Sequence, residues 1–372
     1  MTDLRPSDLL HADLLHSEEE EALRAAVRDL VTDRGTTASV PALVESEASH
    51  DLALWRTLTA GMGLAGLLIP EALDGQGASH REAAVVLEEL GRAVAPVPYL
   101  TSAVVATEAL LECGADDLLR DLASGTALAA LCVGLHTAPT ADFRTVRVAD
   151  GTLYGELPGI ADAGAADVLL VPAEDGALYA VAAPGPSASG ITVVPQVSLD
   201  RTRPVATVVL AGAAGRRLGE SGPAVRRALR AGAGLLASEQ LGVADWALTE
   251  TVRYLTERKQ FNRPVGGFQA LKHRLAQLWL ETAQLRAAAR AAADALATGQ
   301  EPDLAVAVAQ AYAAGVAVHA TEEALQLHGG IGMTWEHPVH LYLKRAKADS
   351  IAYGTAGAHR EWVGELVDLA GV

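Results

Sequence analysis

The hydrophobic residues of this chain repeat with one period near its two ends and with another in its middle. Residues 17–33 place apolar side chains three and four positions apart behind four glutamates, which is typical of an amphipathic helix. The middle third has short valine-rich runs separated by turn signals such as Asp150-Gly151, which is typical of β-strands. From Pro223 onward the helical period returns in long stretches. We therefore expect a helical region, a β region and a helical bundle, in that order.

Capping and turn residues give the expected helices their ends. These helices cover residues 17–33, 52–62, 79–92, 102–113, 116–123, 223–258, 269–296 and 304–327, with one or two more within 339–369. The expected strands cover residues 145–148, 168–171, 178–181, 191–194 and 206–210. A chain of 372 residues is too long for one core, so we predict three domains. They are an N-terminal all-α domain over 1–129, a β-barrel or sandwich over 130–215 and a C-terminal four-helix bundle over 216–372.

Charge and composition exclude several classes of partner. The net charge is −17 and the pI is about 5.0, which makes the chain a poor general binder of nucleic acid or of anionic membranes. Cys113 and Cys132 stand outside any CxxC or clustered His/Cys spacing, so neither a disulfide nor a metal site is expected. The sequence shows no signal peptide at its N-terminus and no conspicuous uncharged apolar window of about 18 residues. We expect a cytoplasmic protein.

Several short motifs occur together along the chain. In the first third they are Leu54-Trp55, Gly-Leu-Ala-Gly-Leu at 63–67, Ile-Pro-Glu at 69–71 and Leu-Glu-Glu-Leu-Gly-Arg at 87–92. In the last third they are Arg-Lys-Gln-Phe at 258–261, Pro-Val-Gly at 264–266, Phe-Gln-Ala at 268–270 and Gln-Leu-His-Gly-Gly-Ile-Gly at 326–332. Together they resemble the acyl-CoA dehydrogenases, and the resemblance runs from about Leu15 to the C-terminus.

The resemblance implies a fold that is mostly α with a central β-domain, and a flavoenzyme activity. Family members remove two hydrogens from an acyl-CoA thioester. A carboxylate takes the α-proton while the β-hydrogen leaves as hydride to the N5 atom of FAD. The electrons then pass to an electron-transfer flavoprotein.

The resemblance fails at the positions of the catalytic base. The family usually has a glutamate before the glycine that is Gly354 here, but this chain has Tyr353, a phenol that stays protonated near pH 7. We therefore expect Tyr353 to be a packing residue. Some members place the base on the long helix, where ungapped spacing from Arg258 gives Gly232. Glu239 lies about 10 Å further along that helix and is a substitute base or a structural carboxylate.

The middle region also departs from the family. A Thr-Glu-Pro loop and a Trp-Ile-Thr strand normally face the isoalloxazine ring. The corresponding stretches here are Val-Gly-Leu-His-Thr-Ala-Pro at 133–139 and Pro-Gly-Ile-Ala at 158–161, which lack most of those hydroxyl, acidic and aromatic groups. We do not expect the chain to hold a flavin ring in its own cleft.

The chain keeps one group of the family's FAD-binding residues. In the family, these residues reach across the dimer and contact the adenosine and pyrophosphate of the neighbouring subunit's FAD. They are Arg258, Gln260, Phe261, Gln269, Gln326, Gly329 and Gly330. An arginine offers a fixed fork of donors to phosphate, and two glycines let backbone N–H groups approach a ligand closely. The alternatives are that Arg258 only complements a helix dipole and that Gln269 is a buried structural amide.

The resemblance thus implies the non-catalytic subunit of an α2β2 acyl-CoA dehydrogenase, which completes the FAD site of a homologous catalytic partner. Such actinobacterial enzymes act on steroid side chains carried as CoA thioesters, and here the steroid expectation rests on subfamily analogy alone. Two other hypotheses remain open. One is a self-sufficient homomeric flavoenzyme with another base, such as Glu239. The other is a flavin-free scaffold protein of the same fold.

Overall fold

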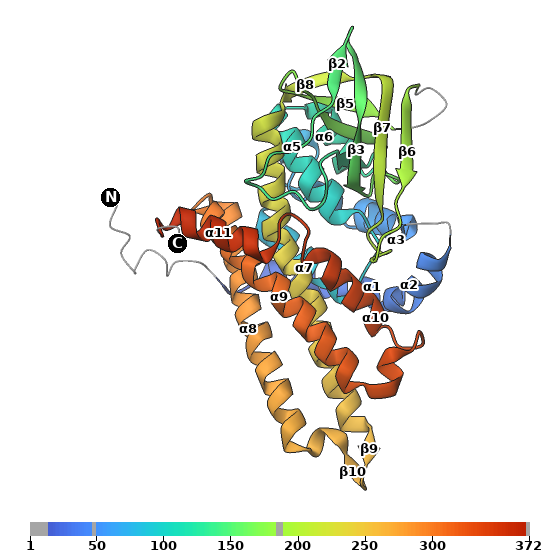
Figure 1. The fold of residues 1–372 in the computed structure, drawn as a ribbon, viewed down its shortest axis with the longest axis vertical. Coiled ribbons are helices and arrows are strands. Elements are labelled where there is room, and N and C mark those ends of the chain that lie inside the picture. The colour runs from blue at the N-terminus through green and yellow to red at the C-terminus, as the bar shows by residue number, and fades with distance from the viewer. Residues whose placement is uncertain (1–13, 47–49, 184–188, 370–372) are drawn as a thin grey trace.

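A long central helix organises the fold. The computed structural model describes residues 14–46, 50–183 and 189–369. Helix α7 (Ser221–Glu257) runs from the β region at one end of the molecule to the far end of a helical bundle (Figure 1). It packs against the N-terminal helices along one part of its length and against the later helices along another. The predicted fold class, mostly α with a central β region, is confirmed.

Polar side chains cap three of the N-terminal helices. The N-terminal helices are α1 (Glu18–Asp33), α2 (Thr36–Glu45), α3 (Leu52–Arg56), α4 (His80–Arg92), α5 (Thr107–Cys113) and α6 (Asp116–Ala123). At α1 the Ser17 hydroxyl accepts a hydrogen bond from Glu20 N–H, and the Glu20 carboxylate accepts one from Ser17 N–H. This reciprocal pair satisfies two of the free donors of a helix end. The predicted helices 52–62 and 102–113 differ, because π-helical turns over Thr57–Gly61 and Tyr99–Ala106 replace part of each.

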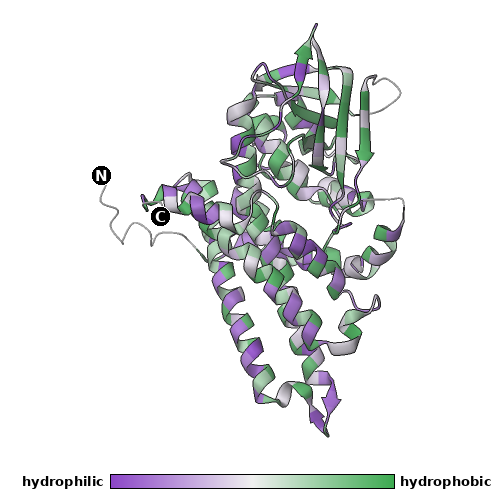
Figure 2. Ribbon diagram, viewed as in Figure 1, coloured by the Kyte–Doolittle hydropathy of each residue, from purple (hydrophilic) through white to green (hydrophobic). Residues whose placement is uncertain are grey.

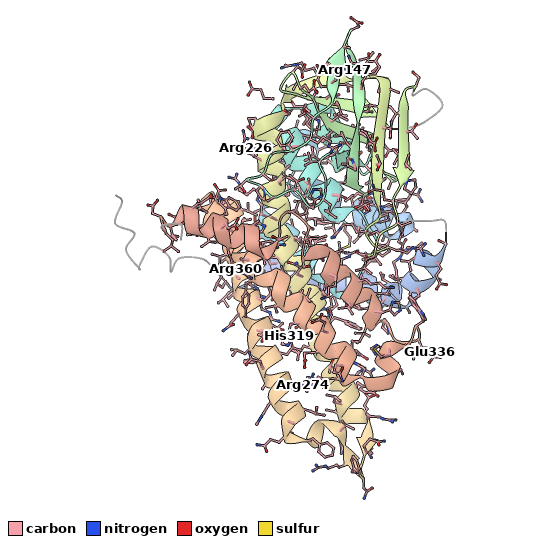
Figure 3. All side chains as sticks on the ribbon, in the orientation of Figure 1. Arg147, Arg226, Arg274, His319, Glu336 and Arg360 are labelled. Atoms are coloured by element: carbon pink, nitrogen blue, oxygen red, sulfur yellow. The ribbon has the colours of Figure 1, made fainter. Side chains whose placement is uncertain are left out.

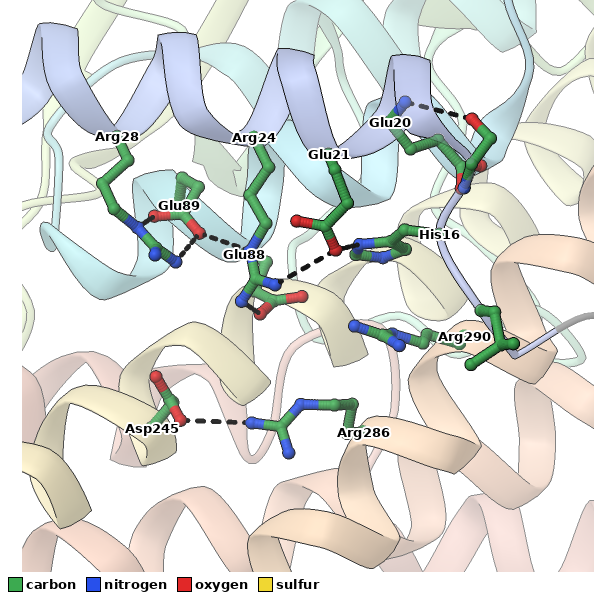
Figure 4. A network of polar contacts seen from close by, with 12 residues as sticks. His16, Glu20, Glu21, Arg24, Arg28, Glu88, Glu89, Asp245, Arg286 and Arg290 are labelled. Atoms are coloured by element: carbon green, nitrogen blue, oxygen red, sulfur yellow. Dashed lines mark hydrogen bonds and ion pairs between the residues drawn. The ribbon is translucent and has the colours of Figure 1, made fainter.

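Ion pairs fix α1 on α4. Arg24 contacts Glu88 at 2.8 Å and Glu89 at 3.0 Å, and Arg28 contacts Glu89 at 2.5 Å (Figure 4). Both glutamates are buried, and this burial raises the pKa of Glu88 although Arg24 opposes it. The two carboxylates depend on these arginines, because a buried carboxylate without a partner is strongly unfavourable.

Glycines let α4 and α7 approach each other backbone to backbone. A Cβ atom at Gly242 would lie 1.9 Å from the carbonyl oxygen of Glu88, and one at Gly91 would lie 2.2 Å from that of Glu239. Real Cβ atoms essentially never come this close to an oxygen, so both positions require glycine. The crossing sets the position of the N-terminal helices relative to the middle of α7.

The β region is a sandwich of two four-stranded sheets. The strands are β1 (Ala129–Leu131), β2 (Arg147–Ala149), β3 (Thr152–Ala161), β4 (Val168–Pro172), β5 (Ala177–Ala182), β6 (Ile191–Pro195), β7 (Val205–Ala214) and β8 (Arg216–Glu220). One sheet has the order β1-β4-β5-β8 and the other β2-β3-β7-β6. Only β1 and β4 pair in parallel among these strands. Leu153, Leu169 and Val208 belong to the buried core of the β region.

The C-terminal helices form the bundle. After α7 come α8 (Gln269–Thr298), α9 (Pro302–Leu327), α10 (Val339–Asp349) and α11 (Ala356–Leu366). Short strands β9 (Lys259–Gln260) and β10 (Arg263–Pro264) form a hairpin between α7 and α8, and Figure 2 shows this hairpin as hydrophilic. Its turn residues, Phe261 and Asn262, have φ values of 53° and 59°. Two left-handed residues in a two-residue loop are the signature of a type I′ turn.

Helix α9 is apolar enough, by length and composition, to cross a membrane, which the sequence prediction had not singled out. However, 56% of its most apolar window is buried inside the protein. A core helix of a bundle meets the same criterion, so this feature is weak evidence for a membrane span.

Candidate functional site

The two positions predicted for a catalytic base face each other. Tyr353, between α10 and α11, is 3% exposed, and its ring lies over Gly232 of α7. A Cβ atom at Gly232 would lie 3.1 Å from Cζ of Tyr353 and 2.9 Å from a methyl carbon of Val105. Burial raises the pKa of the Tyr353 phenol, so the hydroxyl keeps its proton at neutral pH. Neither position offers a group that can take a proton.

The loop over 133–139 closes the space beside Tyr353. The carbonyl of Leu135 accepts a hydrogen bond from Tyr353 N–H at 2.7 Å, and the Leu135 N–H donates to the Gly159 carbonyl at 2.9 Å. A Cβ atom at Gly354 would lie 2.8 Å from that of Ala138. The cavity beside Tyr353, which Leu135, Ala161, Thr101 and Leu229 also line, has a volume of only about 10 Å³. Residues 133–139 and 158–161, the two stretches predicted to lack the flavin-facing groups, therefore pack together. They leave room for no more than about one water molecule.

Glu239 is held in a buried ion cluster. Its two carboxylate oxygens accept hydrogen bonds from Arg203 and Arg345, each at 2.5 Å. Burial opposes ionisation, but Arg203 and Arg345 outweigh it and lower the pKa of Glu239. A carboxylate that is ionised and bound by two guanidinium groups is not free to accept a proton. The position of Glu239 therefore favours the structural interpretation over the substitute base.

The ion cluster contains three carboxylates and two arginines. Arg345 also bonds to Asp200 at 2.7 Å, and Arg203 to Asp349 at 2.7 Å. The other oxygen of Asp349, Oδ2, is buried and has no partner among the described residues. Burial, with the nearby Glu239 charge, raises the pKa of Asp349 to about 8. With a proton on Asp349 the cluster is neutral. It joins the β6–β7 loop to α7 and α10.

The sequence did not reveal this cluster. Arg203 and Arg345 are far from Glu239 along the chain, and neither was predicted to be its partner. The available signal was the polar run Asp200, Thr202 and Arg203, which stands between two apolar strands. An arginine buried at such a position requires anionic partners.

The seven residues predicted to contact a neighbour's FAD are all exposed, and they lie at the end of the bundle away from the β region. Helix α7 ends there, α8 starts there and α9 returns there (Figure 1). The side chains of Arg258, Gln269 and Gln326 make no hydrogen bond or ion pair with the part of the chain that the structure describes. Gln269 is thus not a buried structural amide. We call these seven residues the exposed binding face.

One contact joins the two segments of the exposed binding face. The ring of Tyr254, one turn before Arg258, stacks on His328 with 4.5 Å between centroids. His328 is buried and immediately precedes Gly329. Phe261, at the hairpin tip, is 87% exposed, and a left-handed bulky residue is uncommon. Such strain is often kept where a side chain must be presented.

Apolar side chains continue beyond the exposed binding face. In the loop between α9 and α10, Met333 is 75% exposed and Trp335 is 73% exposed. The ammonium group of Lys344 lies 4.4 Å from the centre of the Trp335 ring. Exposed apolar groups of this size are unusual unless they mark an interaction surface.

A separate pocket of about 550 Å³ lies near the N-terminal end of α7. Arg226, which projects from the outer edge of α7, lines it together with Arg227 and Arg230 (Figure 3). Arg227 pairs with Glu108 at 2.5 Å, and Arg230 with Asp303 at 3.1 Å. The carboxylates offset most of the positive charge, so the pocket is not strongly basic.

Comparison with known proteins identifies the family. The acyl-CoA dehydrogenase N-terminal domain matches residues 17–127, and the acyl-CoA dehydrogenase C-terminal domain matches residues 220–367. The chain is 36% identical to acyl-CoA dehydrogenase IpdE2 of Mycolicibacterium smegmatis over 338 residues, 91% of this chain and 95% of the relative.

Two solved structures are similar along nearly the whole chain. The ChsE4-ChsE5 complex from Mycobacterium tuberculosis has a chain with a TM-score of 0.85 and 29% identity, covering 97% of this chain and 100% of that one. A variant of the Tcur3481-Tcur3483 steroid ACAD has a chain with a TM-score of 0.83 and 32% identity, covering 94% of this chain and 98% of that one. The similarity extends through the helical domains and the sandwich alike, and this chain therefore belongs to the acyl-CoA dehydrogenase family.

Proposed function

We propose that this chain is the non-catalytic subunit of a heteromeric, FAD-dependent acyl-CoA dehydrogenase. In an α2β2 assembly it would complete the FAD site of a homologous partner that keeps its catalytic glutamate. The partner would carry out the α,β-dehydrogenation of the acyl-CoA thioester and pass the electrons to an electron-transfer flavoprotein in the cytoplasm.

The observation that carries the proposal is the contrast between a closed cleft and an exposed binding face. Next to Tyr353 the cavity is about 10 Å³, far below the about 300–1,000 Å³ of an ordinary ligand pocket. At the other end of the bundle, Arg258, Gln269 and Gln326 have polar side chains without partners in the described part of the chain. A chain that can bind only the far end of a dinucleotide needs another subunit to hold the ring.

FAD is the cofactor of the family, and the residues present fit only part of it. The exposed binding face offers a guanidinium group, two glycine N–H groups and an aromatic ring, which suit a pyrophosphate and an adenosine. The cleft beside Tyr353 has no space for the isoalloxazine ring. When bound, FAD supplies the hydride acceptor, whereas this chain supplies positioning contacts.

The relatives support the substrate class and the partner. One similar structure is described as a steroid ACAD formed by Tcur3481 and Tcur3483, and another as a complex of ChsE4 with ChsE5. We extend both descriptions to this chain. The substrate would be a bulky steroid side chain carried as a CoA thioester, and the partner would be a second acyl-CoA dehydrogenase chain.

Absorbance of the purified protein tests the proposal. The chain is expressed alone and, in parallel, with a related chain that keeps the glutamate and the Thr-Glu-Pro loop. We expect a colourless protein in the first case. In the second we expect a yellow complex with one FAD per pair of unlike chains and with dehydrogenase activity.

Two outcomes would overturn the assignment. A yellow homomer of this chain that turns over acyl-CoA would show that it is self-sufficient. A yellow co-expressed complex that keeps its FAD when Arg258, Gln326 and Phe261 are all replaced by alanine would show that the exposed binding face does not hold the cofactor.

A further inference from the structure

Three side chains that can bind a metal ion meet behind the Gly329-Gly330 turn. Glu250 comes from α7, His328 directly follows α9, and His337 lies in the loop before α10. Each residue offers one ligand atom, an imidazole nitrogen or a carboxylate oxygen, and these three atoms all lie within 4.8 Å of one another. The function proposed above uses none of these three residues.

His328 has the hydrogen bonding of a prepared metal ligand. Its Nδ1 lies 2.7 Å from the carbonyl oxygen of Ala324, which can only accept, so Nδ1 carries the proton. Its Nε2 therefore carries a lone pair, and this atom is buried without a partner among the described residues. Histidine ligands typically donate their second N–H to a carbonyl or carboxylate in this way. Tyr254, stacked on the ring, holds its orientation.

The other two ligands are close and can reach the same point. Nε2 of His337 lies 3.8 Å from Oε1 of Glu250, compared with about 3.3 Å between ligand atoms around a tetrahedral zinc ion. Glu250 now accepts hydrogen bonds from Arg253 at 2.5 and 2.9 Å. Arg253 is largely exposed and also bonds to Glu257 at 2.7 Å, so it can turn away from Glu250. A small rotation of Glu250 and His337 would then complete the site.

One contact opposes coordination. Val339 N–H donates to Nδ1 of His337 at 3.3 Å, which favours the tautomer with its proton on Nε2. Coordination through Nε2 moves this proton to Nδ1 and gives up the bond with Val339, which is already long. Burial lowers the pKa of both His328 and His337, which keeps the imidazoles in the neutral form that binds metals.

We propose that Glu250, His328 and His337 form a binding site for a divalent transition-metal ion of the zinc class, with water at the remaining position. Two imidazoles and one carboxylate are a suitable ligand set for such an ion. We expected no metal site from the sequence, because it has no CxxC or clustered His/Cys spacing. The three ligands come from different elements, which only the folded chain brings together. A bound ion would join α7 to both ends of the α9–α10 loop and would fix the Gly329-Gly330 turn.

Metal titration of the full-length chain tests the site. Protein dialysed against EDTA is titrated with Co(II), whose visible absorption reports nitrogen and oxygen ligands, and with Zn(II) followed by calorimetry. We expect one strong equivalent per chain and weakening by at least tenfold in both His337→Gln and Glu250→Gln. His319→Gln is the matched control, since His319 lies on α9 beside Glu281 at 2.7 Å but outside the cluster (Figure 3).

A measurement on the wild-type chain tests the site even if the variants fold poorly. In the wild-type chain, bound Co(II) should shift most strongly the NMR signals of the imidazoles that it touches, so two strongly shifted imidazole N–H signals are expected. A wild-type chain that binds no equivalent of Co(II) or Zn(II) would overturn the proposal. Metal binding of unchanged strength in both His337→Gln and Glu250→Gln would also overturn it.

Discussion

The ring of Tyr353 fills the space that a side chain at Gly232 would need, since a Cβ there would lie 3.1 Å from the Tyr353 Cζ. These are the two positions that the sequence predicts for a catalytic base. The side chain at one position therefore restricts the side chain at the other. A glutamate introduced at Gly232 would require Tyr353 and Val105 to move.

Replacing Gly232 by alanine should destabilise the chain, although alanine is the better helix former. The added methyl group meets Val105 and Tyr353, and overpacking of this kind costs about 1–3 kcal/mol. Gly315 in α9 is the matched control, because nothing lies within 4 Å of its added Cβ. Gly315→Ala should stabilise the chain by about 0.5–1 kcal/mol. Urea unfolding of both variants measures the difference, and equal shifts would contradict the close packing at Gly232.

Replacing Arg258 by alanine should weaken FAD binding by the co-expressed complex by about 1.5–3 kcal/mol, the value of a hydrogen bond to a charged group. Fluorescence titration of the FAD-free complex measures the change. Arg360→Ala is the control, because it removes the same charge from α11, away from the hairpin (Figure 3). If the two variants bind FAD equally well, Arg258 is only an exposed residue at a helix end.

Glu239→Gln should lower the free energy of unfolding by about 3 kcal/mol, because Arg203 and Arg345 lose their shared buried anion. Glu257→Gln removes an exposed partner of Arg253 and should cost about 1 kcal/mol or less. Chemical denaturation compares the two. Loss of turnover in the complex without loss of stability would instead identify Glu239 as a base.

Asp349 should make the protein less stable as the pH rises. Its pKa is about 8 in the folded chain and about 3.9 when unfolded, so between these values the folded state binds the extra proton. The stability contributed by this proton is complete below about pH 4 and is lost as the pH rises through 8. The slope is at most about 1.4 kcal/mol per pH unit.

Asp349→Asn isolates this effect, because asparagine does not titrate. The difference in unfolding free energy between wild type and variant, measured by urea unfolding at several pH values, should change steadily from pH 5 to pH 8. The wild type should lose stability relative to the variant over this range. A constant difference would mean that Asp349 is ionised throughout.

Local signals predicted the helix ends well and the strands less well. Ser17 and Ser79 were identified as starting points, and each caps its helix. β3 was missed because it contains Gly155, Pro158 and Gly159, which have low strand propensity. It is a strand because β7 pairs with it along most of its length, with an irregularity between Leu157 and Ile160 that accommodates the Pro-Gly pair.

The motifs single out exposed residues, whereas the buried ion-pair partners leave no local signal. Arg258 and Gln326 lie on the surface, which a binding role requires, but that role stays a prediction. The environment of Glu239 depends on Arg203 and Arg345, which only the folded chain brings together. The same holds for His328 and Glu250, whose proximity follows from the packing of α7 against α9.

The apolar side chains at the end of the bundle have a consequence for the amount in which this protein is synthesised. Phe261, Met333 and Trp335 are each more than 70% exposed. If the partner of the proposed complex covers this surface, a copy synthesised in excess of that partner would present these side chains to chaperones and proteases, which remove proteins that display such surfaces. Synthesis of the two chains in matched amounts would then keep the surface covered from the start.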